Sequence, residues 1–174
     1  MTLAQEIELL GGERAYRQFT EENFEDKKML SKVKNYPKEN YFFWGDVGTG
    51  KTHLGIAIGR KLLPNFKLVR VQDISRKIRG AFDEREEKEF INMFADTNCL
   101  IDDLGSEKYT EFLLSVMYEI IDKKWQNMSG GWIITSNHDI PTISKILGDR
   151  VTSRLVDIVG SNIIHFSGSD RRIK

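Results

Sequence analysis

The sequence predicts an α/β fold in which a parallel sheet carries a phosphate-binding loop at the carboxyl ends of its strands. Three observations predict this fold: a phosphate-loop motif at 45–52, an alternation of apolar segments with helical patterns after it, and polar residues directly after the apolar segments. Strands separated by helices form right-handed βαβ units, which give a parallel sheet. Ligands of such sheets bind at the carboxyl ends of the strands.

The alternation predicts each element in turn. Apolar runs predict strands at 41–45, 67–71, 99–101, 132–135 and 162–166. Helical periodicity predicts helices at 51–63, 73–81, 84–95, 110–128, 141–147 and 149–157. Pro64 ends the first of these helices. Residues 1–40 are a polar leader with weaker helical patterns over 3–10 and 13–18, so we expect a leader at 1–40 and a nucleotide-binding domain at 41–174.

Residues 45–52 are a complete GxxxxGK[ST] phosphate-binding loop, entered by an apolar run and left by a helical pattern. Its glycines let backbone N–H groups face an anion, and the next helix presents its positive end to the same anion. Lys51 is expected on the β- and γ-phosphates and Thr52 on Mg²⁺. The flanking strand and helix favour this over a glycine-rich turn that binds nothing. The predicted nucleotide-binding residues here are Gly45, Asp46, Val47, Gly48, Thr49, Gly50, Lys51, Thr52 and His53.

Two further strands end in polar residues. Asp102 and Asp103 follow the strand at 99–101, and Asn137 follows the strand at 132–135. Asp102 is expected to hold Mg²⁺, and Asp103 to polarise the water that attacks the γ-phosphate, with two solvated aspartates as the alternative. Asn137 lies near the γ-phosphate if its strand is beside the first strand. Otherwise it is an ordinary strand-end cap.

Two pairs of arginines lie toward the C-terminus. Arg150 and Arg154 are four residues apart on a predicted helix, so they share one face. Arginine can spread the charge of a phosphoryl-transfer transition state, also from a neighbouring subunit, although arginines on a surface helix are usually only solvated. Arg171 and Arg172 follow the last predicted strand.

The composition limits the classes of function. The chain has 174 residues, 40% of them hydrophobic, and a formal net charge of zero. It is therefore not a uniformly basic nucleic-acid-binding protein, and contact with DNA needs a local patch. The single cysteine, Cys99, excludes an internal disulfide and fits a cytoplasmic location. No stretch approaches the roughly 18 apolar residues of a membrane span, so we expect no membrane partner.

Taken together, the motifs resemble AAA+ ATPases of the DnaC/IstB-type helicase-loader and transposition-helper clade. The resemblance covers about residues 13–174. It is carried by GDVGTGKT at 45–52, CLIDDLGSEK at 99–108, IITSN at 133–137, GDRVTSRL at 148–155 and FSGSDRR at 166–172, with YRQFTEENF at 16–24 before the core. It implies a five-stranded parallel sheet in the order 5-1-4-3-2, flanked by helices and without a helical lid domain.

The resemblance also implies roles for single residues, with ATP and Mg²⁺ as cofactors. Asn137 would be the polar sensor of the γ-phosphate. Either Arg150 or Arg154, with Arg150 favoured, would be the arginine finger that reaches the next subunit's site. Arg171, or in its place Arg172, would sense nucleotide within its own subunit. The implied partners are a replicative helicase or another DNA-bound protein, single-stranded DNA, and further copies of the chain.

In this clade the region between strands two and three faces single-stranded DNA. Arg76, Lys77 and Arg79 lie in that region and could contact phosphates. The acidic segment at 83–89 opposes this, and a solvated helix pair of mixed charge is the alternative.

Three functions fit these observations. The first is ATP hydrolysis by a DnaC-like helicase loader in DNA replication, or by an IstB-like transposition helper. The second is an ATP-binding switch with little turnover, and the third is a small-molecule phosphotransferase. Asp103 and a finger arginine favour the first. The third needs an arginine-rich lid over a second substrate, and the sequence gives no sign of one.

Overall fold

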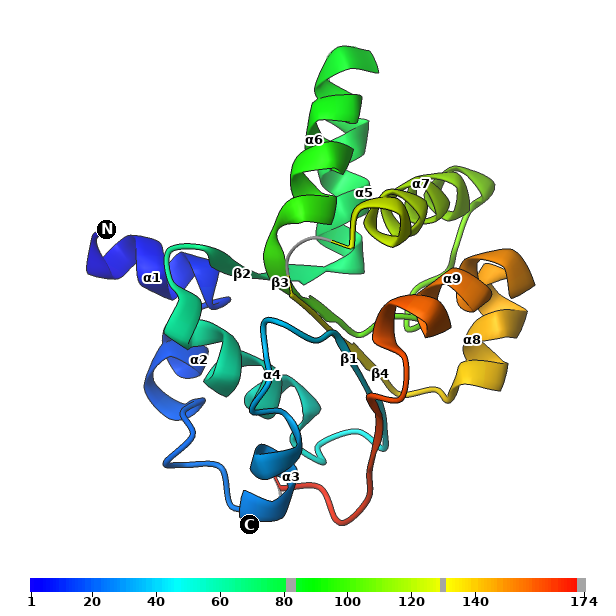
Figure 1. Ribbon diagram of the computed structural model, residues 1–174. Coiled ribbons are helices and arrows are strands. Elements are labelled where there is room, and N and C mark those ends of the chain that lie inside the picture. Colours follow the sequence, from blue (N-terminus) through cyan, green and yellow to red (C-terminus); the bar gives the residue numbers. More distant parts are fainter. Residues whose placement is uncertain (81–83, 129–130, 172–174) are drawn as a thin grey trace.

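A five-stranded parallel sheet forms the centre of the described protein (Figure 1). The computed structural model describes residues 1–80, 84–128 and 131–171. The strand order is β2-β3-β4-β1-β5, which is the predicted order read from the other edge and confirms it. The strands are β1 (Tyr41–Gly45), β2 (Phe66–Arg70), β3 (Asn98–Asp102), β4 (Trp132–Ser136) and β5 (Ile163–Phe166).

Side-chain alternation on β1 explains why both faces of the sheet are covered. Phe42 faces one hydrophobic cluster with Ile101 and Ile134, whereas Tyr41 and Phe43 face the other. Tyr41, Phe42 and Phe43 are all fully buried, as expected for a strand in a parallel sheet with helices on both faces. Because β1 lies between β4 and β5, the loop that follows it is flanked by the carboxyl ends of both strands.

The helices divide between the two faces of the sheet (Figure 1). Helix α4 and the leader cover one face, and the helices that follow β3 and β4 cover the other. The helices after β1 are α4 (Lys51–Gly59), the 3₁₀ turn η1 (Arg60–Leu62), α5 (Val71–Arg79), α6 (Glu84–Asp96), α7 (Glu111–Asn127), α8 (Ile140–Leu147) and α9 (Asp149–Val159). The predicted helix at 51–63 is thus α4 continued by η1, and the predicted end of strand two, Val71, is instead the buried first residue of α5.

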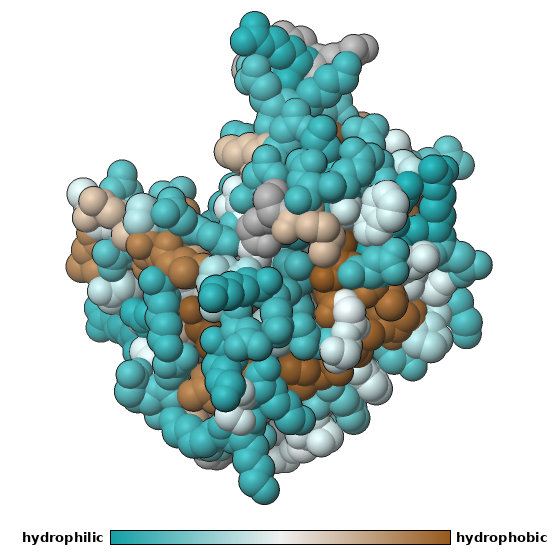
Figure 2. Space-filling model, in the orientation of Figure 1, coloured by the Kyte–Doolittle hydropathy of each residue, from teal (hydrophilic) through white to brown (hydrophobic). Residues whose placement is uncertain are grey.

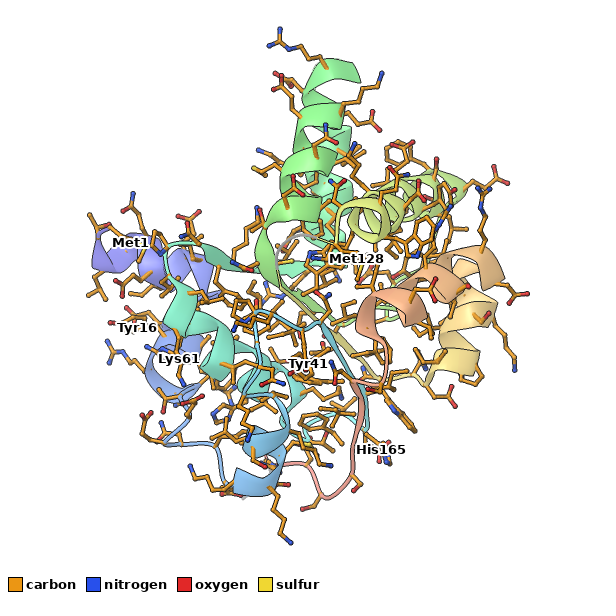
Figure 3. All side chains as sticks on the ribbon, in the orientation of Figure 1. Met1, Tyr16, Tyr41, Lys61, Met128 and His165 are labelled. Atoms are coloured by element: carbon orange, nitrogen blue, oxygen red, sulfur yellow. The ribbon has the colours of Figure 1, made fainter. Side chains whose placement is uncertain are left out.

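The leader forms three short helices, α1 (Leu3–Leu9), α2 (Glu13–Gln18) and α3 (Lys27–Lys32), of which the sequence did not predict α3. Leu10, Phe24 and Val33 are buried in the same hydrophobic cluster as β1 and α4. At the end of α4, Arg60 donates to the carbonyl oxygen of Tyr16, 3.1 Å away. Tyr16 and Lys61 accordingly lie on the same side of the molecule (Figure 3). The leader therefore packs against α4, beside the phosphate loop.

Helices α5 and α6 project from the edge of the sheet (Figure 1). Hydrophilic side chains cover much of this projection (Figure 2). Buried apolar residues such as Ile78 and Phe94 join its base to the main hydrophobic cluster. Among the described residues, no helix has the length and apolar character needed to cross a bilayer.

Candidate nucleotide-binding site

The phosphate loop joins the end of β1 to α4, and its glycines are needed for its shape. Gly45, Gly48 and Gly50 have φ angles of 137°, 78° and 101°, which side chains other than glycine rarely adopt. A Cβ atom on Gly45 would lie 1.9 Å from the carbonyl oxygen of Phe166 on β5. The loop can therefore curl against β5 and lead directly into the N-terminus of α4, which is the arrangement that binds anions.

Lys51 joins the phosphate loop to the end of β4. Its side chain is only 5% exposed, and its Nζ donates to the carbonyl oxygens of Gly45 and Asp46, each 2.7 Å away. It also donates to Oδ1 of Asn137 at 3.0 Å. The structure thus brings Asn137 to the phosphate loop because β4 pairs with β1. An ammonium group held here is placed to bind a phosphate.

Asp102 ends β3 and lies against the first turn of α4. Its Oδ1 accepts hydrogen bonds from the hydroxyl groups of Thr52 at 2.8 Å and Thr135 at 2.7 Å. Burial raises the pKa of Asp102, and these two hydroxyls and the charge of Asp103 act on it more weakly. Sequence reasoning missed Thr135, although it lies in the quoted IITSN segment. Its signal is a hydroxyl residue within an otherwise apolar buried strand.

Asp102→Asn should make the nucleotide-free protein more stable at neutral pH. Because burial raises the pKa of Asp102, the folded state favours the protonated carboxyl, and this contribution to stability is lost as the pH rises through the folded pKa. Asparagine stays neutral and keeps the oxygen that accepts from Thr52 and Thr135. Thermal unfolding without Mg²⁺ should show a Tm gain of a few degrees at about pH 8 that shrinks toward about pH 4. An equal gain at both pH values would contradict this account.

Asp103 has a different environment from Asp102. It is exposed, and its φ of 59° is in the left-handed region, which Asp and Asn tolerate better than most residues. Its backbone N–H donates to Oγ1 of Thr135 at 3.0 Å, which fixes this conformation. Its side chain lines the cavity over the phosphate loop. Backbone strain of this kind is common at functional sites.

A cavity of about 510 Å³ lies over the phosphate loop and is large enough for a nucleotide. The phosphate loop, β3 and β4 supply one side of it, and the leader supplies the other. Its described lining residues are Arg14, Gln18, Phe19, Asn23, Val47, Gly48, Gly50, Lys51, Thr52, His53, Asp103, Asn137 and Arg171. No single-residue pattern in the sequence points to the leader side chains among them, since their position depends on how the leader packs on α4.

His53 connects α4 to the leader. Its ring stacks on Phe19 with the centroids 4.9 Å apart, meets Phe24 edge-on, and its Nε2 lies 3.0 Å from the carbonyl oxygen of Thr20. Burial lowers the pKa of His53, so the neutral ring is favoured and its Nε2–H can donate to this carbonyl. His53 is thus at the cavity wall, where it holds the leader in place.

Arg171 also reaches the phosphate loop. Its backbone N–H donates to the carbonyl oxygen of Gly48 at 3.0 Å, and its guanidinium carbon lies 5.2 Å from the ring centroid of Phe24. Arg171 lines the cavity, and its role as a sensor of nucleotide stays a prediction. The other predicted position, Arg172, is outside the described residues.

These residues fit ATP with Mg²⁺. Backbone N–H groups at a helix N-terminus and a buried ammonium suit phosphates. The Thr52 hydroxyl and the Asp102 carboxylate, 2.8 Å apart, are hard oxygen ligands of the type that Mg²⁺ shares with nucleotide phosphates. Among the described residues, no group of three His, Cys, Asp or Glu side chains forms a separate metal site.

Arg150 and Arg154 lie on α9, and neither is among the described residues that line the cavity. Arg154 is 18% exposed and forms an ion pair with Asp122 at 2.8 Å, whereas Arg150 is exposed. The guanidinium carbons of both lie within 5 Å of the ring centroid of Tyr118. An arginine that acts on another subunit has to be exposed, so this difference favours Arg150.

Arg76 and Lys77 are exposed on α5, in the projection. Asp73 pairs with Arg76 at 3.5 Å, and Glu86, Glu87 and Glu89 of α6 line the same surface hollow as both basic residues. The surface therefore has mixed charge. Arg79 lies in α5, but its side chain is outside the described part of the chain.

The order of these motifs along the chain matches a known family over nearly its whole length. The family described as "IstB-like ATP binding protein" matches residues 16–173. The chain belongs to this family. Among curated relatives of this family member, the uncharacterized protein YdaV of Escherichia coli K12 is 26% identical over 152 residues, 81% of this chain and 61% of that protein. The replicative helicase loader DnaC of the same strain is 28% identical over 138 residues, 72% and 56% of the two chains. The chain thus spans about three fifths of the length of these relatives.

Solved structures agree on the fold. This family member matches the crystal structure of the DnaC helicase loader with a TM-score of 0.68 and 21% identity, over 82% of this chain and 89% of that one. A putative primosome component from Streptococcus pyogenes serotype M3 matches with a TM-score of 0.71 and 19% identity, over 99% and 100% of the chains. The replication initiator DnaA bound to AMPPCP and single-stranded DNA gives 0.69 and 22%, over 88% and 51%. The fold is therefore that of the AAA+ phosphate-loop proteins.

Proposed function

We propose that this protein is a Mg²⁺-dependent ATPase of the DnaC-like loader type, which hydrolyses ATP in an ATP-dependent assembly of several copies. It acts in DNA replication on a replicative helicase or another DNA-bound protein. The observation that carries the proposal is that the ends of β1, β3 and β4 meet at one place. Lys51, after β1, donates a hydrogen bond to Asn137, after β4, and Thr52 donates one to Asp102 at the end of β3. Together with Asp103 in the cavity, this supplies a phosphate ligand, metal ligands, a polar sensor and a base.

In this proposal each residue has one task. Lys51 binds the β- and γ-phosphates and Thr52 and Asp102 hold Mg²⁺, which neutralises phosphate charge when bound. Asp103 accepts a proton from the attacking water, and Asn137 orients that water and the γ-phosphate. Arg171 senses the nucleotide from within the same copy. The products are ADP and phosphate.

An IstB-like transposition helper is the alternative that shares this site, and the family match favours it as a second candidate. The two differ in the DNA-bound protein they act on, so binding to a replicative helicase separates them. An ATP switch with little turnover has no use for a base in the cavity, and Asp103 disfavours it.

Arg150→Ala should leave ATP binding by the isolated chain unchanged and lower turnover by roughly three orders of magnitude. The reason is that Arg150 is exposed on α9 and is free to act on the site of a neighbouring copy. The measurement is the specific rate of ATP hydrolysis against protein concentration, with and without single-stranded DNA. For the unchanged chain the specific rate should climb with concentration.

Arg154→Ala is the matched comparison, because Arg154 is on the same face but paired with Asp122. It should lower stability more than turnover. A flat, near-zero rate in the unchanged chain together with tight ATP binding would support the switch. Normal turnover in Arg150→Ala with loss in Arg154→Ala would assign the finger to Arg154.

Replacement of Arg76 and Lys77 by alanine should weaken binding to single-stranded DNA without changing ATP binding. We propose that these exposed side chains of α5 contact phosphates. Each lost contact should reduce the slope of log affinity against log salt by roughly 0.7. Arg85→Ala is the control, since Arg85 pairs with an acidic neighbour as Arg76 does but lies on α6 instead of α5. Equal effects of both changes would assign the binding to overall charge instead of to α5.

A further inference from the structure

Where α7 and α9 pack against each other, two arginines of α9 alternate in space with two aromatic rings of α7. The guanidinium carbon of Arg150 lies 4.8 Å from the ring centroid of Tyr118, and that of Arg154 lies 4.9 Å from the same centroid. Arg154 lies 5.2 Å from the ring centroid of Trp125. We call Arg150, Tyr118, Arg154 and Trp125 the arginine ladder. Its two helices lie side by side (Figure 1).

The inner part of the arginine ladder is fixed from several sides. Arg154 is 18% exposed and pairs with Asp122 of α7 at 2.8 Å. Trp125 donates from Nε1 to Oδ2 of Asp157 on α9 at 3.0 Å. These contacts cross between the helices, and the Arg154 guanidinium held by them also lies against the Tyr118 ring. Arg150, at the outer end, is exposed and rests against that ring.

We propose that Tyr118 is a positioning residue, which holds the Arg150 guanidinium in the orientation in which it enters the nucleotide site of a second copy of this chain. The inference rests on the proposed function, in which Arg150 acts on a neighbouring copy. An unrestrained arginine side chain occupies many rotamers, and the entropy lost when it is ordered opposes its entry into a site. A ring that already restricts the guanidinium reduces this cost, and small misplacements of a catalytic group are expensive in rate. Arg154 is in this view an anchor for the ring.

The test uses mixtures in which one copy supplies the site and another supplies the arginine. A copy carrying Asp103→Asn still offers Arg150 but does not hydrolyse ATP in its own site. A copy carrying Arg150→Ala has an intact site but offers no arginine. Mixed with ATP and single-stranded DNA, the two should restore hydrolysis. Tyr118→Leu is then added to one partner at a time.

Tyr118→Leu in the copy that supplies Arg150 should lower the restored rate by roughly tenfold. The same change in the copy that supplies only the site should leave the restored rate unaltered. Tyr118→Phe keeps the ring and should restore hydrolysis from either copy. This dependence on which copy carries the change separates positioning of Arg150 from a general effect on folding, because a folding defect acts from both copies.

Four results would overturn the inference. Restored rates unaffected by Tyr118→Leu in both copies would show that the ring is not needed. Equal loss from both copies would assign Tyr118 a structural role between α7 and α9. If Tyr118→Phe lowered the restored rate as much as Tyr118→Leu, the contact between the ring and the guanidinium would not be the cause of the loss. If the mixture of Asp103→Asn and Arg150→Ala copies with Tyr118 unchanged failed to hydrolyse ATP, Arg150 would not act between copies. That result would contradict the proposed action of Arg150, and with it the inference.

Discussion

Asp103→Asn should leave ATP binding intact and slow hydrolysis by roughly two to four orders of magnitude. Asparagine has the same shape and also tolerates the left-handed backbone that Asp103 adopts, at a φ of 59°. The backbone N–H of residue 103 can still donate to Thr135. The substitution therefore removes a carboxylate from the cavity and keeps the backbone. Titration with ATP and a phosphate-release assay measure the two effects separately.

Glu111→Gln is a matched control for Asp103→Asn. Glu111 is an exposed carboxylate in the first turn of α7 and is not among the described residues that line the cavity. The Glu111→Gln protein should bind and hydrolyse ATP like the unchanged chain. If Asp103→Asn turned over ATP at the unchanged rate, Asp103 would not be the base, and the proposed division of labour between Asp102 and Asp103 would be wrong.

Lys51→Ala should raise the Kd for ATP by roughly two to three orders of magnitude. The substitution removes the buried cation of the site and leaves the carbonyl oxygens of Gly45 and Asp46 without the hydrogen bonds that Lys51 donates. Because ligand binding stabilises the folded state, the Tm of the unchanged chain should rise with added ATP and Mg²⁺. That rise should be absent in Lys51→Ala.

Lys145→Ala controls for loss of a lysine, since Lys145 is exposed on α8. Its Tm should rise with ATP as in the unchanged chain. The Tm without nucleotide shows whether Lys51→Ala still folds. A Lys51→Ala protein that folds and keeps an unchanged Kd would contradict the assignment of the cavity as the ATP site.

Together the two substitutions separate binding from chemistry. A loader that works by hydrolysis loses function in both, whereas a switch that works by binding alone keeps its function in Asp103→Asn. Binding to the partner protein with each variant therefore tests the proposed function beyond the ATPase assay.

Local patterns predicted most of the fold. The strand at 41–45 agrees with β1, and the long helix predicted at 110–128 agrees with α7 to within one residue at each end. These elements have strong apolar periodicity and clear end signals, such as Thr110, whose side chain accepts from the backbone N–H of Leu113. Helix α3 has only six residues and no buried residue, so its pattern was too weak to predict.

The phosphate loop, the acidic pair and the polar strand end could be located from the sequence, because each is a short motif of adjacent residues. Features that depend on residues far apart in the chain became visible only in the folded structure. It brought Thr135 to Asp102 and placed the leader over the phosphate loop through His53 and Arg60. It also distinguished the partly buried, paired Arg154 from the exposed Arg150. Burial and pairing across helices arise only when the chain packs, so spacing along the sequence does not encode them.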